Sequence, residues 1–371
     1  MTSLIVFGEY LCHQMGGAER STREIVERLS RRPGLAITPV SGVCRHYQAT
    51  RDRIPYEGLV EIPVKRLSLR LPFLQYALNS RDVADYFRRV EADVLFANAQ
   101  AAPMAVNAFG GPSVYFIHDE MSLNVYRTYE TSAWKRLKFA VRFALDAPFV
   151  AHYRRENLRA MRGAALVVAN SRYMADRAER LLGVRPVVVY PQIDVATLSR
   201  VELPPLEERP FIMMVGDSEV KGAGTFRKIA AAMPEERFLA VGRGYSDGQD
   251  GNITLRGFAS DPVSYYRHAK LVLLPSTWEE GFGMVSVEAG ALGIPAVVSD
   301  RGGLPETVPS RDQVVGDYRD PESWVTSIRR VLDDHAAWSA SSREHAGRFD
   351  GGRQLDVLVE AVREATGVSL G

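Results

Sequence analysis

The chain has 371 residues, more than one hydrophobic core usually holds, so its length predicts two domains. Hydrophobic residues make up 46% and charged residues 25% of the sequence, which excludes a collagen-like or wholly disordered chain, and no apolar run is long enough for a transmembrane helix. The net charge of +1 hides an asymmetry: residues 1–200 carry 28 Lys and Arg against 19 Asp and Glu, whereas residues 201–371 carry 18 against 26. The basic half could meet an anionic surface, although solvated helix faces that differ in charge explain the asymmetry equally well.

The beginning of the chain and its cysteines indicate a reducing compartment. Residues 1–10 have neither a basic segment nor a cleavage site, so they predict a first strand rather than a signal peptide. Cys12 and Cys44 are too few for a disulfide framework, and neither lies in a Cys-x-x-Cys pair. These features favour the cytoplasm.

Short apolar runs alternate with helical stretches along the whole chain. The predicted strands cover residues 4–7, 36–40, 94–97, 114–117, 166–169, 211–215, 238–241, 253–255, 271–274 and 296–299. Such alternation predicts parallel sheets with helices on both faces. Ser171 is predicted to cap the N-terminus of a helix after the fifth strand.

The pattern runs twice, which predicts two doubly wound domains facing a cleft. A stretch rich in proline and acidic residues lies between the two runs and has the composition of a linker. The predicted parts are a first domain, a linker, a second domain and a C-terminal helix, at residues 1–193, 194–210, 211–350 and 351–371. Ligands of such sheets bind beyond the carboxyl ends of the strands.

The segment from residue 271 to residue 306 carries the clearest chemistry. Its sequence is LVLLPSTWEEGFGMVSVEAGALGIPAVVSDRGGLPE, in which Gly281, Phe282 and Gly283 follow a strand and a loop. Glycines allow the backbone to approach a ligand closely. A helix predicted to start near Met284 would present free N–H groups to an anion such as a diphosphate.

Two carboxylates flank these glycines. Glu288 lies among apolar and small residues one turn into the predicted helix, so its charge needs a partner, and sugar hydroxyls could be that partner. Glu280 precedes the glycines and could stabilise positive charge on a reacting sugar carbon.

Glu280 and Glu288 are separated by seven residues, with Gly-Phe-Gly after the first. This resembles the E-x7-E signature of the retaining family-4 glycosyltransferases, which have the GT-B fold. The resemblance extends through residues 293–295 and 300–306, is strong over residues 211–308 and is looser before them. It implies an α/β protein of two Rossmann-like domains that transfers a sugar from a nucleotide-diphosphate donor to a hydroxyl acceptor. The first domain would bind the acceptor, the second would bind the nucleotide sugar, and the C-terminal helix would return to the first domain.

The resemblance assigns further donor-binding residues to the second domain. Gly216 lies in a segment, VGDSEVKG at residues 215–222, that resembles the opening of the family's second domain. Lys221 matches the lysine that binds the donor diphosphate. The family usually has an arginine where this chain has Asp217. Either another arginine takes its place, with Arg243 a candidate, or the donor is held differently.

Other matches involve the first domain and the nucleotide base. Gly16 and Gly17 resemble a glycine loop that faces the donor phosphate or the acceptor, and His118 matches a histidine near the transferred sugar. His13, beside the glycine loop, could touch an acceptor. Residues 256–258, which include Phe258, match a segment that makes backbone contacts to the nucleotide base, so the base cannot be read from side chains. A structural role remains the alternative for each of these residues.

The resemblance implies a division of roles. Lys221 and the N–H groups of residues 281–284 would stabilise the leaving diphosphate, Glu288 would hold the ribose hydroxyls, and Glu280 would steady the oxocarbenium charge. His118 would contact the sugar. The acceptor would attack from the face that the diphosphate leaves, and the departing phosphate oxygen would take the acceptor's proton.

Several motifs are missing from the sequence. It has no Asp-x-Asp pair and no Cys/His cluster with metal spacing, so we expect neither a metal nor another cofactor. The first strand is not followed by Gly-x-Gly-x-x-Gly, which argues against an NAD enzyme, and no Gly-x-Ser-x-Gly elbow is present.

The stretch from Arg127 to Arg162 is basic and rich in aromatic residues. It contains nine Lys and Arg against three Asp and Glu, with apolar side chains between them. This composition predicts peripheral contact with an anionic membrane, on the inner face of the cell membrane. The alternative is an ordinary helix that faces the core, or a wall of the acceptor site. Nucleic acid is not expected, because no binding module accompanies the charge.

The sequence does not identify the acceptor. A UDP- or GDP-sugar donor is expected, with bacterial polysaccharide, glycolipid and natural-product glycans all open as products. Two other functions stay open: a non-catalytic nucleotide-sugar-binding protein, suggested by Asp217, and a GT-B sugar-nucleotide epimerase.

Overall fold

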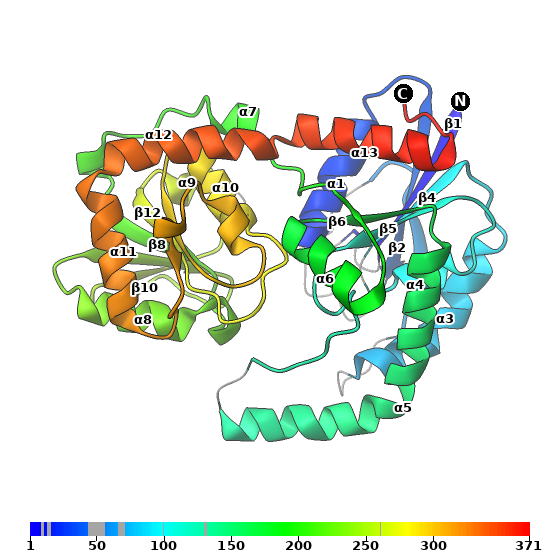
Figure 1. Ribbon diagram of the computed structural model, residues 1–371, viewed down its shortest axis with the longest axis horizontal. Helices are drawn as coiled ribbons and strands as arrows, with labels where there is room; N and C mark the ends of the chain where they lie inside the picture. Colours follow the sequence, from blue (N-terminus) through cyan, green and yellow to red (C-terminus); the bar gives the residue numbers. More distant parts are fainter. Residues whose placement is uncertain are drawn as a thin grey trace. The chain divides into compact units, whose positions relative to one another are not determined.

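A computed structural model describes residues 1–8, 11–12, 16–43, 56–65, 71–98, 100–129, 132–259 and 261–371. The described chain divides into two compact units: Met1–Gln192 together with Gly352–Gly371, and Ile193–Gly351. Each unit contains a seven-stranded sheet (Figure 1).

The first unit contains strands β1–β7 and most of the long helices. The strands are β1 (Thr2–Gly8), β2 (Leu35–Val43), β3 (Val60–Pro63), β4 (Val94–Asn98), β5 (Ser113–Ile117), β6 (Leu166–Ala169) and β7 (Val187–Val188). The helices are α1 (Gly17–Leu29), α3 (Pro72–Phe87), α4 (Ala102–Val106), α5 (Ala133–Gly163), α6 (Arg172–Leu182) and α13 (Gly351–Thr366). The strand order is β3-β2-β1-β4-β5-β6-β7, and every pair is parallel.

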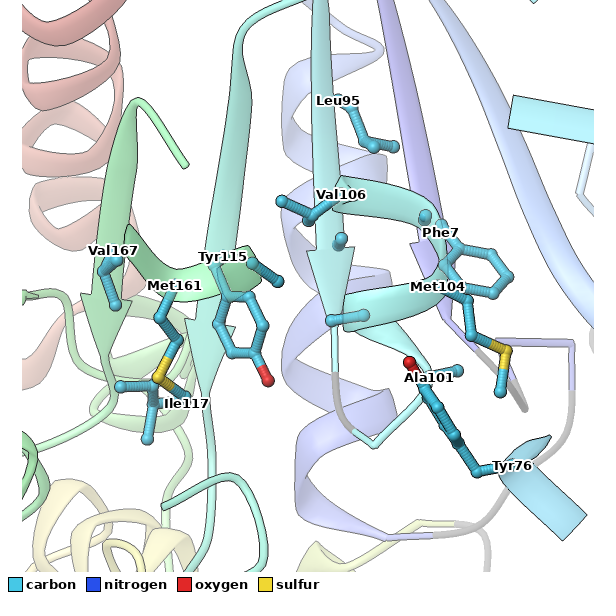
Figure 2. Close-up of a cluster of buried hydrophobic side chains, with 14 of the residues drawn as sticks. Phe7, Tyr76, Leu95, Ala101, Met104, Val106, Tyr115, Ile117, Met161 and Val167 are labelled. Atoms are coloured by element: carbon cyan, nitrogen blue, oxygen red, sulfur yellow. The ribbon is translucent and has the colours of Figure 1, made fainter. Parts of the chain in front are cut away.

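Alternate side chains of β1 enter separate cores on the two faces of this sheet. Ile5 and Phe7 belong to the core that contains residues of α3, α4 and α5, part of which Figure 2 shows. Leu4 and Val6 belong to the other core, beneath α1 and α13. Burial on both faces explains why the strand is a continuous apolar run.

The second unit repeats the plan with shorter helices. Its strands are β8 (Phe211–Val215), β9 (Arg237–Gly242), β10 (Gly248–Asp250), β11 (Ile253–Gly257), β12 (Ala269–Leu274), β13 (Ala296–Ser299) and β14 (Val314–Val315). Its α-helices are α7 (Val195–Leu198), α8 (Ala223–Ala232), α9 (Val263–Tyr266), α10 (Met284–Ala291), α11 (Pro321–Asp333) and α12 (His335–Ala346). Short 3-10 helices are η1 (Leu206–Glu208), η2 (Glu219–Lys221), η3 (Leu304–Thr307), η4 (Arg311–Gln313) and η5 (Gly347–Phe349).

The second sheet has the order β10-β11-β9-β8-β12-β13-β14. Its pairs are parallel except that of β10 with β11. Residues 193–210 belong to this unit, and Leu198, Val201 and Leu203 pack against one of its cores.

The predicted fold class, two doubly wound parallel sheets, is confirmed, and all ten predicted strands are present. The strands that the sequence did not predict are β3, β7, β10 and β14, which are the edge strands of the two sheets. They have two to four residues each and are largely exposed or half-buried, so they lack the apolar run of a central strand.

A buried carboxylate joins two helices of the first unit. Asp146 of α5 is 2% exposed, and its two oxygens accept hydrogen bonds from the backbone N–H groups of Phe73 (2.9 Å) and Leu74 (2.7 Å). These N–H groups lie in the first turn of α3, whose own N-cap residue, Leu71, supplies no side-chain hydrogen bond. Asp146 therefore supplies the cap that Leu71 does not, and its negative charge interacts favourably with the positive end of the α3 dipole.

We expect Asp146→Ala to lower the free energy of unfolding by about 1–3 kcal/mol, because it leaves a buried and a part-buried N–H donor without their acceptor. Urea unfolding followed by circular dichroism measures the effect. Asp82→Ala, an exposed position on α3, is the matched control and should change stability by less than about 0.5 kcal/mol. Equal effects of the two substitutions would contradict the capping role.

Candidate active site

The order of the second sheet brings together two segments that are far apart in sequence. The chain passes outward in one direction from β8 through β9 and in the other from β12 through β13, so the order reverses between the neighbours β8 and β12. Lys221 follows β8 and Glu280 follows β12. Both therefore lie at a topological switch point, where ligands of α/β sheets bind.

Lys221 and Glu280 form an ion pair at this point. The Lys221 Nζ atom lies 2.7 Å from Oε1 and 2.8 Å from Oε2 of Glu280. The Ser276 hydroxyl donates to Oε1 (2.5 Å), and the ammonium group lies 5.0 Å from the centroid of the Trp278 ring. Glu280 itself is only 8% exposed.

The pKa of Glu280 reflects two opposing influences. Burial alone would raise it, but the charge of Lys221 and the hydrogen bonds from Lys221 and Ser276 outweigh burial and hold the pKa below its ordinary value of 4.5. The carboxylate is therefore ionised at neutral pH, as an electrostatic role toward a cationic sugar carbon requires.

Two glycines allow the segments to approach. A Cβ atom on Gly222, beside Lys221, would lie 2.0 Å from the carbonyl oxygen of Pro275. A Cβ atom on Gly302 would lie 2.0 Å from the carbonyl oxygen of Glu280. Both residues have positive φ angles, 93° and 64°, which only glycine adopts easily. The ion pair thus depends on glycine in both of the loops that surround it.

The helix α10 begins beside this pair, at Met284 as predicted. Its N-cap, Gly283, has φ 145° and no side chain that could accept a hydrogen bond from the N–H groups of the first turn. Phe282 is buried, with its ring 5.2 Å from that of Phe349. Gly281, Phe282, Gly283 and Met284 therefore form the start of this helix and the loop before it, and the Phe282 ring anchors the loop in the core.

Glu288 lies on α10 and is 3% exposed. The Tyr266 hydroxyl of α9 donates to its Oε2 atom (3.0 Å). A tyrosine of the same chain is therefore one partner of this carboxylate, for which the sequence had suggested sugar hydroxyls. Sequence reasoning missed Tyr266, since it lies 22 residues away and carries no motif.

Asp217, the departure from the family pattern, has a structural role. Its Oδ2 atom accepts a hydrogen bond from the backbone N–H of Gly244, and a Cβ atom on Gly242 would lie 2.7 Å from the Asp217 Cβ atom. Asp217 therefore stabilises the turn after β9. Gly216, which precedes it, donates its N–H to the Val241 carbonyl.

Arg243 and Phe258 lie together at the ends of two neighbouring strands. Arg243 follows β9 and Phe258 follows β11. The Arg243 guanidinium lies 5.3 Å from the centroid of the Phe258 ring, which is 41% exposed. An exposed stacked pair at the carboxyl end of the sheet can meet a planar base or a phosphate.

His118 lies at the corresponding end of the first sheet, after β5. Its Nε2 atom is 2.9 Å from Oδ1 of Asn98, which ends β4. The Asn98 amide nitrogen donates to the Phe7 carbonyl (3.4 Å), so Oδ1 accepts and Nε2 of His118 carries the proton. Sequence reasoning missed Asn98, although a polar residue at the end of a buried strand was a signal.

Burial lowers the pKa of His118 to about 4, against a smaller opposing effect of Asp119. The ring is therefore neutral at physiological pH, and its Nδ1 atom is an acceptor. Stability falls as the pH drops from 6.5 toward 4, because the unfolded chain then binds a proton that the folded ring does not.

The N-terminus of α1 contains Gly16 and Gly17. Gly16 is the N-cap, and α1 begins at Gly17. Burial raises the pKa of Glu19, while hydrogen bonds from the backbone of Glu19 and Gly16 lower it. The Glu19 carboxylate thus accepts hydrogen bonds from backbone N–H groups at the N-terminus of its own helix. His13 and Cys44 lie outside the described residues.

Ser171 caps α6 by accepting a hydrogen bond from the Met174 N–H (3.1 Å), which confirms that prediction. Across the part of the chain that the structure describes, no group of three or more His, Cys, Asp or Glu could hold a metal ion.

In α/β domains, anionic ligands bind at a switch point of a doubly wound sheet and at a helix N-terminus without a side-chain cap, and the lysine–glutamate pair lies at such a place. Comparison with known families is more specific. Residues 15–197 match the family model "Glycosyltransferase Family 4", and residues 209–334 match "Glycosyl transferases group 1". Together the two models cover most of the chain, which belongs to this glycosyltransferase family.

Curated relatives match a part of this chain. The D-inositol 3-phosphate glycosyltransferase of Corynebacterium kroppenstedtii is 36% identical over 119 residues, which are 30% of this chain and 26% of the relative. The protein of that name from Saccharomonospora viridis is 40% identical over 111 residues, 28% of this chain and 25% of the relative. The matches thus span about a quarter of these relatives' length.

Solved structures resemble the chain over its full length. Sucrose-phosphate synthase from Thermosynechococcus elongatus has a TM-score of 0.73 at 16% identity, with 100% of both chains covered. Anabaena HepE in complex with UDP-glucose has a TM-score of 0.68 at 19% identity, covering 98% of this chain and 100% of HepE. At these identities the likeness shows the fold, which is the GT-B fold expected from the sequence.

Lys221→Met tests the electrostatic coupling. Wild-type Glu280 stabilises the fold above pH 4.5, and this contribution is lost as the pH falls through its lowered pKa. Without Lys221, we expect burial to raise the pKa of Glu280 relative to wild type. The stability of the variant relative to wild type should therefore be lowest at neutral pH and should recover as the pH falls.

Thermal unfolding midpoints between about pH 5 and 8 measure this difference. Lys228→Met, which removes an exposed lysine from α8, is the matched control and should show no such pH dependence. A Lys221→Met deficit that stays constant with pH would mean that Glu280 does not depend on Lys221.

Proposed function

We propose that the chain is a retaining glycosyltransferase that needs no metal. It transfers a sugar from a nucleoside diphosphate donor to a hydroxyl acceptor. The observation that carries this proposal is the ion pair of Lys221 with the buried, ionised Glu280 at the switch point of the second sheet, beside the start of α10.

The donor diphosphate would lie between Lys221 and the first turn of α10. An ammonium group has three N–H donors, and the two contacts to Glu280 account for two of them. The third, together with the N–H groups of residues 281–284, would bind the phosphate oxygens and neutralise the leaving group without a metal. Arg243 would supply the positive charge that the family's arginine, replaced here by Asp217, usually provides.

Glu280 would act on the sugar. As the bond between the anomeric carbon and the diphosphate oxygen breaks, positive charge develops on the carbon, and a fixed carboxylate nearby stabilises it. The acceptor hydroxyl oxygen then bonds to that carbon on the same face. Its proton passes to the departing phosphate oxygen, so no protein nucleophile is consumed.

The remaining roles follow from the positions of the side chains. Glu288 would accept hydrogen bonds from the ribose hydroxyls while Tyr266 holds its other side. Neutral His118 would accept a hydrogen bond from the sugar through Nδ1. The two hydroxyl groups of a ribose suit a buried carboxylate, since hydroxyls donate and carboxylates accept.

A UDP-sugar is the favoured donor, since the similar HepE structure contains UDP-glucose. A GDP-sugar is the second choice. The acceptor would be a glycan, a lipid-linked glycan or a small molecule. Relatives named D-inositol 3-phosphate glycosyltransferase support a small polyol among these. The turn-stabilising contacts of Asp217 weaken the case for a non-catalytic binding protein.

The test is a screen of UDP-, GDP- and ADP-sugars, followed by release of nucleoside diphosphate with and without EDTA. We expect one donor to be bound and slowly hydrolysed, with no effect of EDTA. Binding of none of them would contradict the proposal, and loss of turnover in EDTA would contradict metal independence.

Glu280→Gln separates binding from chemistry. We expect the rate to fall by about 100-fold or more, because the transition-state charge loses its partner, while nucleoside diphosphate affinity changes little. Glu207→Gln, an exposed position on η1, is the control and should behave as wild type. A parallel loss of affinity and rate would assign Glu280 to donor binding instead.

A further inference from the structure

The N-terminal half of α5 carries an exposed apolar face. Trp134, Leu137, Val141 and Leu145 are 62%, 54%, 52% and 60% exposed. Their spacing of three, four and four residues places them on one side of the helix. We call these four residues the α5 apolar face.

The other side of the same helix meets the core. Phe143 packs against the buried cluster of the first unit, and the Phe139 ring stacks on it with centroids 6.1 Å apart. Asp146 points inward to cap α3. These residues lie about half a turn away from the α5 apolar face, so the face is not explained by packing within the chain.

Such exposure is concentrated on this helix. In the portion of the chain that the structure describes, eleven large hydrophobic residues are exposed, and four of them form the α5 apolar face. Single exposed apolar residues are ordinary, but a contiguous exposed stripe indicates a surface that binds something.

The charge of the segment identifies the partner. Residues 132–145 contain Lys135, Arg136, Lys138 and Arg142 and no acidic residue. The Lys138 ammonium lies 5.1 Å from the centroid of the Trp134 ring, at the edge of the stripe. Long basic side chains beside an apolar stripe can bury their stems while their charges reach anionic headgroups.

A second copy of the chain fits this charge poorly. Two such helices packed through their apolar faces would bring together basic residues of both copies, with no acidic residue of either segment to oppose them. Like charges at such a contact are unfavourable. An anionic lipid surface has both the apolar interior and the opposite charge.

We propose that the α5 apolar face lies in the interface of a bilayer that contains anionic lipid, and that it holds the first unit at the membrane surface. No helix in the described ranges is long and apolar enough to cross a membrane. The proposed contact is peripheral, with α5 lying along the bilayer surface. The sequence pattern covered the whole stretch from Arg127 to Arg162; the structure assigns the contact to residues 134–145 within it.

The test is cosedimentation of the full chain with vesicles of phosphatidylcholine alone and with about 30% phosphatidylglycerol. Binding is expected to the anionic vesicles and to weaken as salt is added. The variant Leu137→Gln/Val141→Gln/Leu145→Gln, which keeps good helix formers, should bind about tenfold more weakly or worse.

The matched control is Leu181→Gln/Val357→Gln, which removes exposed apolar residues from α6 and α13 and should bind as wild type. Fluorescence adds a local probe: vesicles should shift the emission of the wild type to the blue, and Trp134→Phe should abolish the shift. Circular dichroism of each variant reports whether α5 remains folded.

Failure of wild type to bind anionic vesicles at low salt would overturn the proposal. Equal binding by the triple variant would also overturn it. A concentration-dependent dimer that the triple variant loses would assign the face to a second copy. Donor hydrolysis is measured without vesicles, so failure here is distinct from failure of the proposed function.

Discussion

The ion pair of Lys221 and Glu280 is the constraint on which the second unit depends. A buried carboxylate without a partner is costly, so the loops after β8 and β12 must keep the two side chains within hydrogen-bond distance. That approach requires backbone contacts that only glycine permits, at Gly222 and Gly302. The glycines in these loops are therefore a consequence of the ion pair.

The two units place different chemistry at equivalent ends of similar sheets. The second unit contributes charge, with Glu280 ionised beside a lysine. The first contributes the neutral His118, whose tautomer is set by Asn98. In the proposed reaction this division is useful, because the diphosphate needs positive charge and the uncharged sugar needs only hydrogen bonds. A charged imidazole would instead oppose the positive charge that develops on the sugar carbon.

The sequence predicted those features whose signal is local. Central strands are apolar on both faces, and the start of α10, the Ser171 cap and the helix at residues 351–366 are set by their own residues. Edge strands such as β10 have no such signal. The contacts of the site depend on strand order, so Tyr266 and Asn98 could not be paired with Glu288 and His118 in advance. The roles of all these residues toward a donor remain predictions.

The most direct measurement is a crystal structure of the chain with a nucleoside diphosphate bound. The account predicts phosphate oxygens within hydrogen-bond distance of the Lys221 Nζ atom and of the N–H groups in the first turn of α10, with the ribose hydroxyls on Glu288. A nucleotide bound at another place, with Lys221 contacting Glu280 alone, would contradict it. In that case the ion pair would stabilise the fold and would not be part of the donor site.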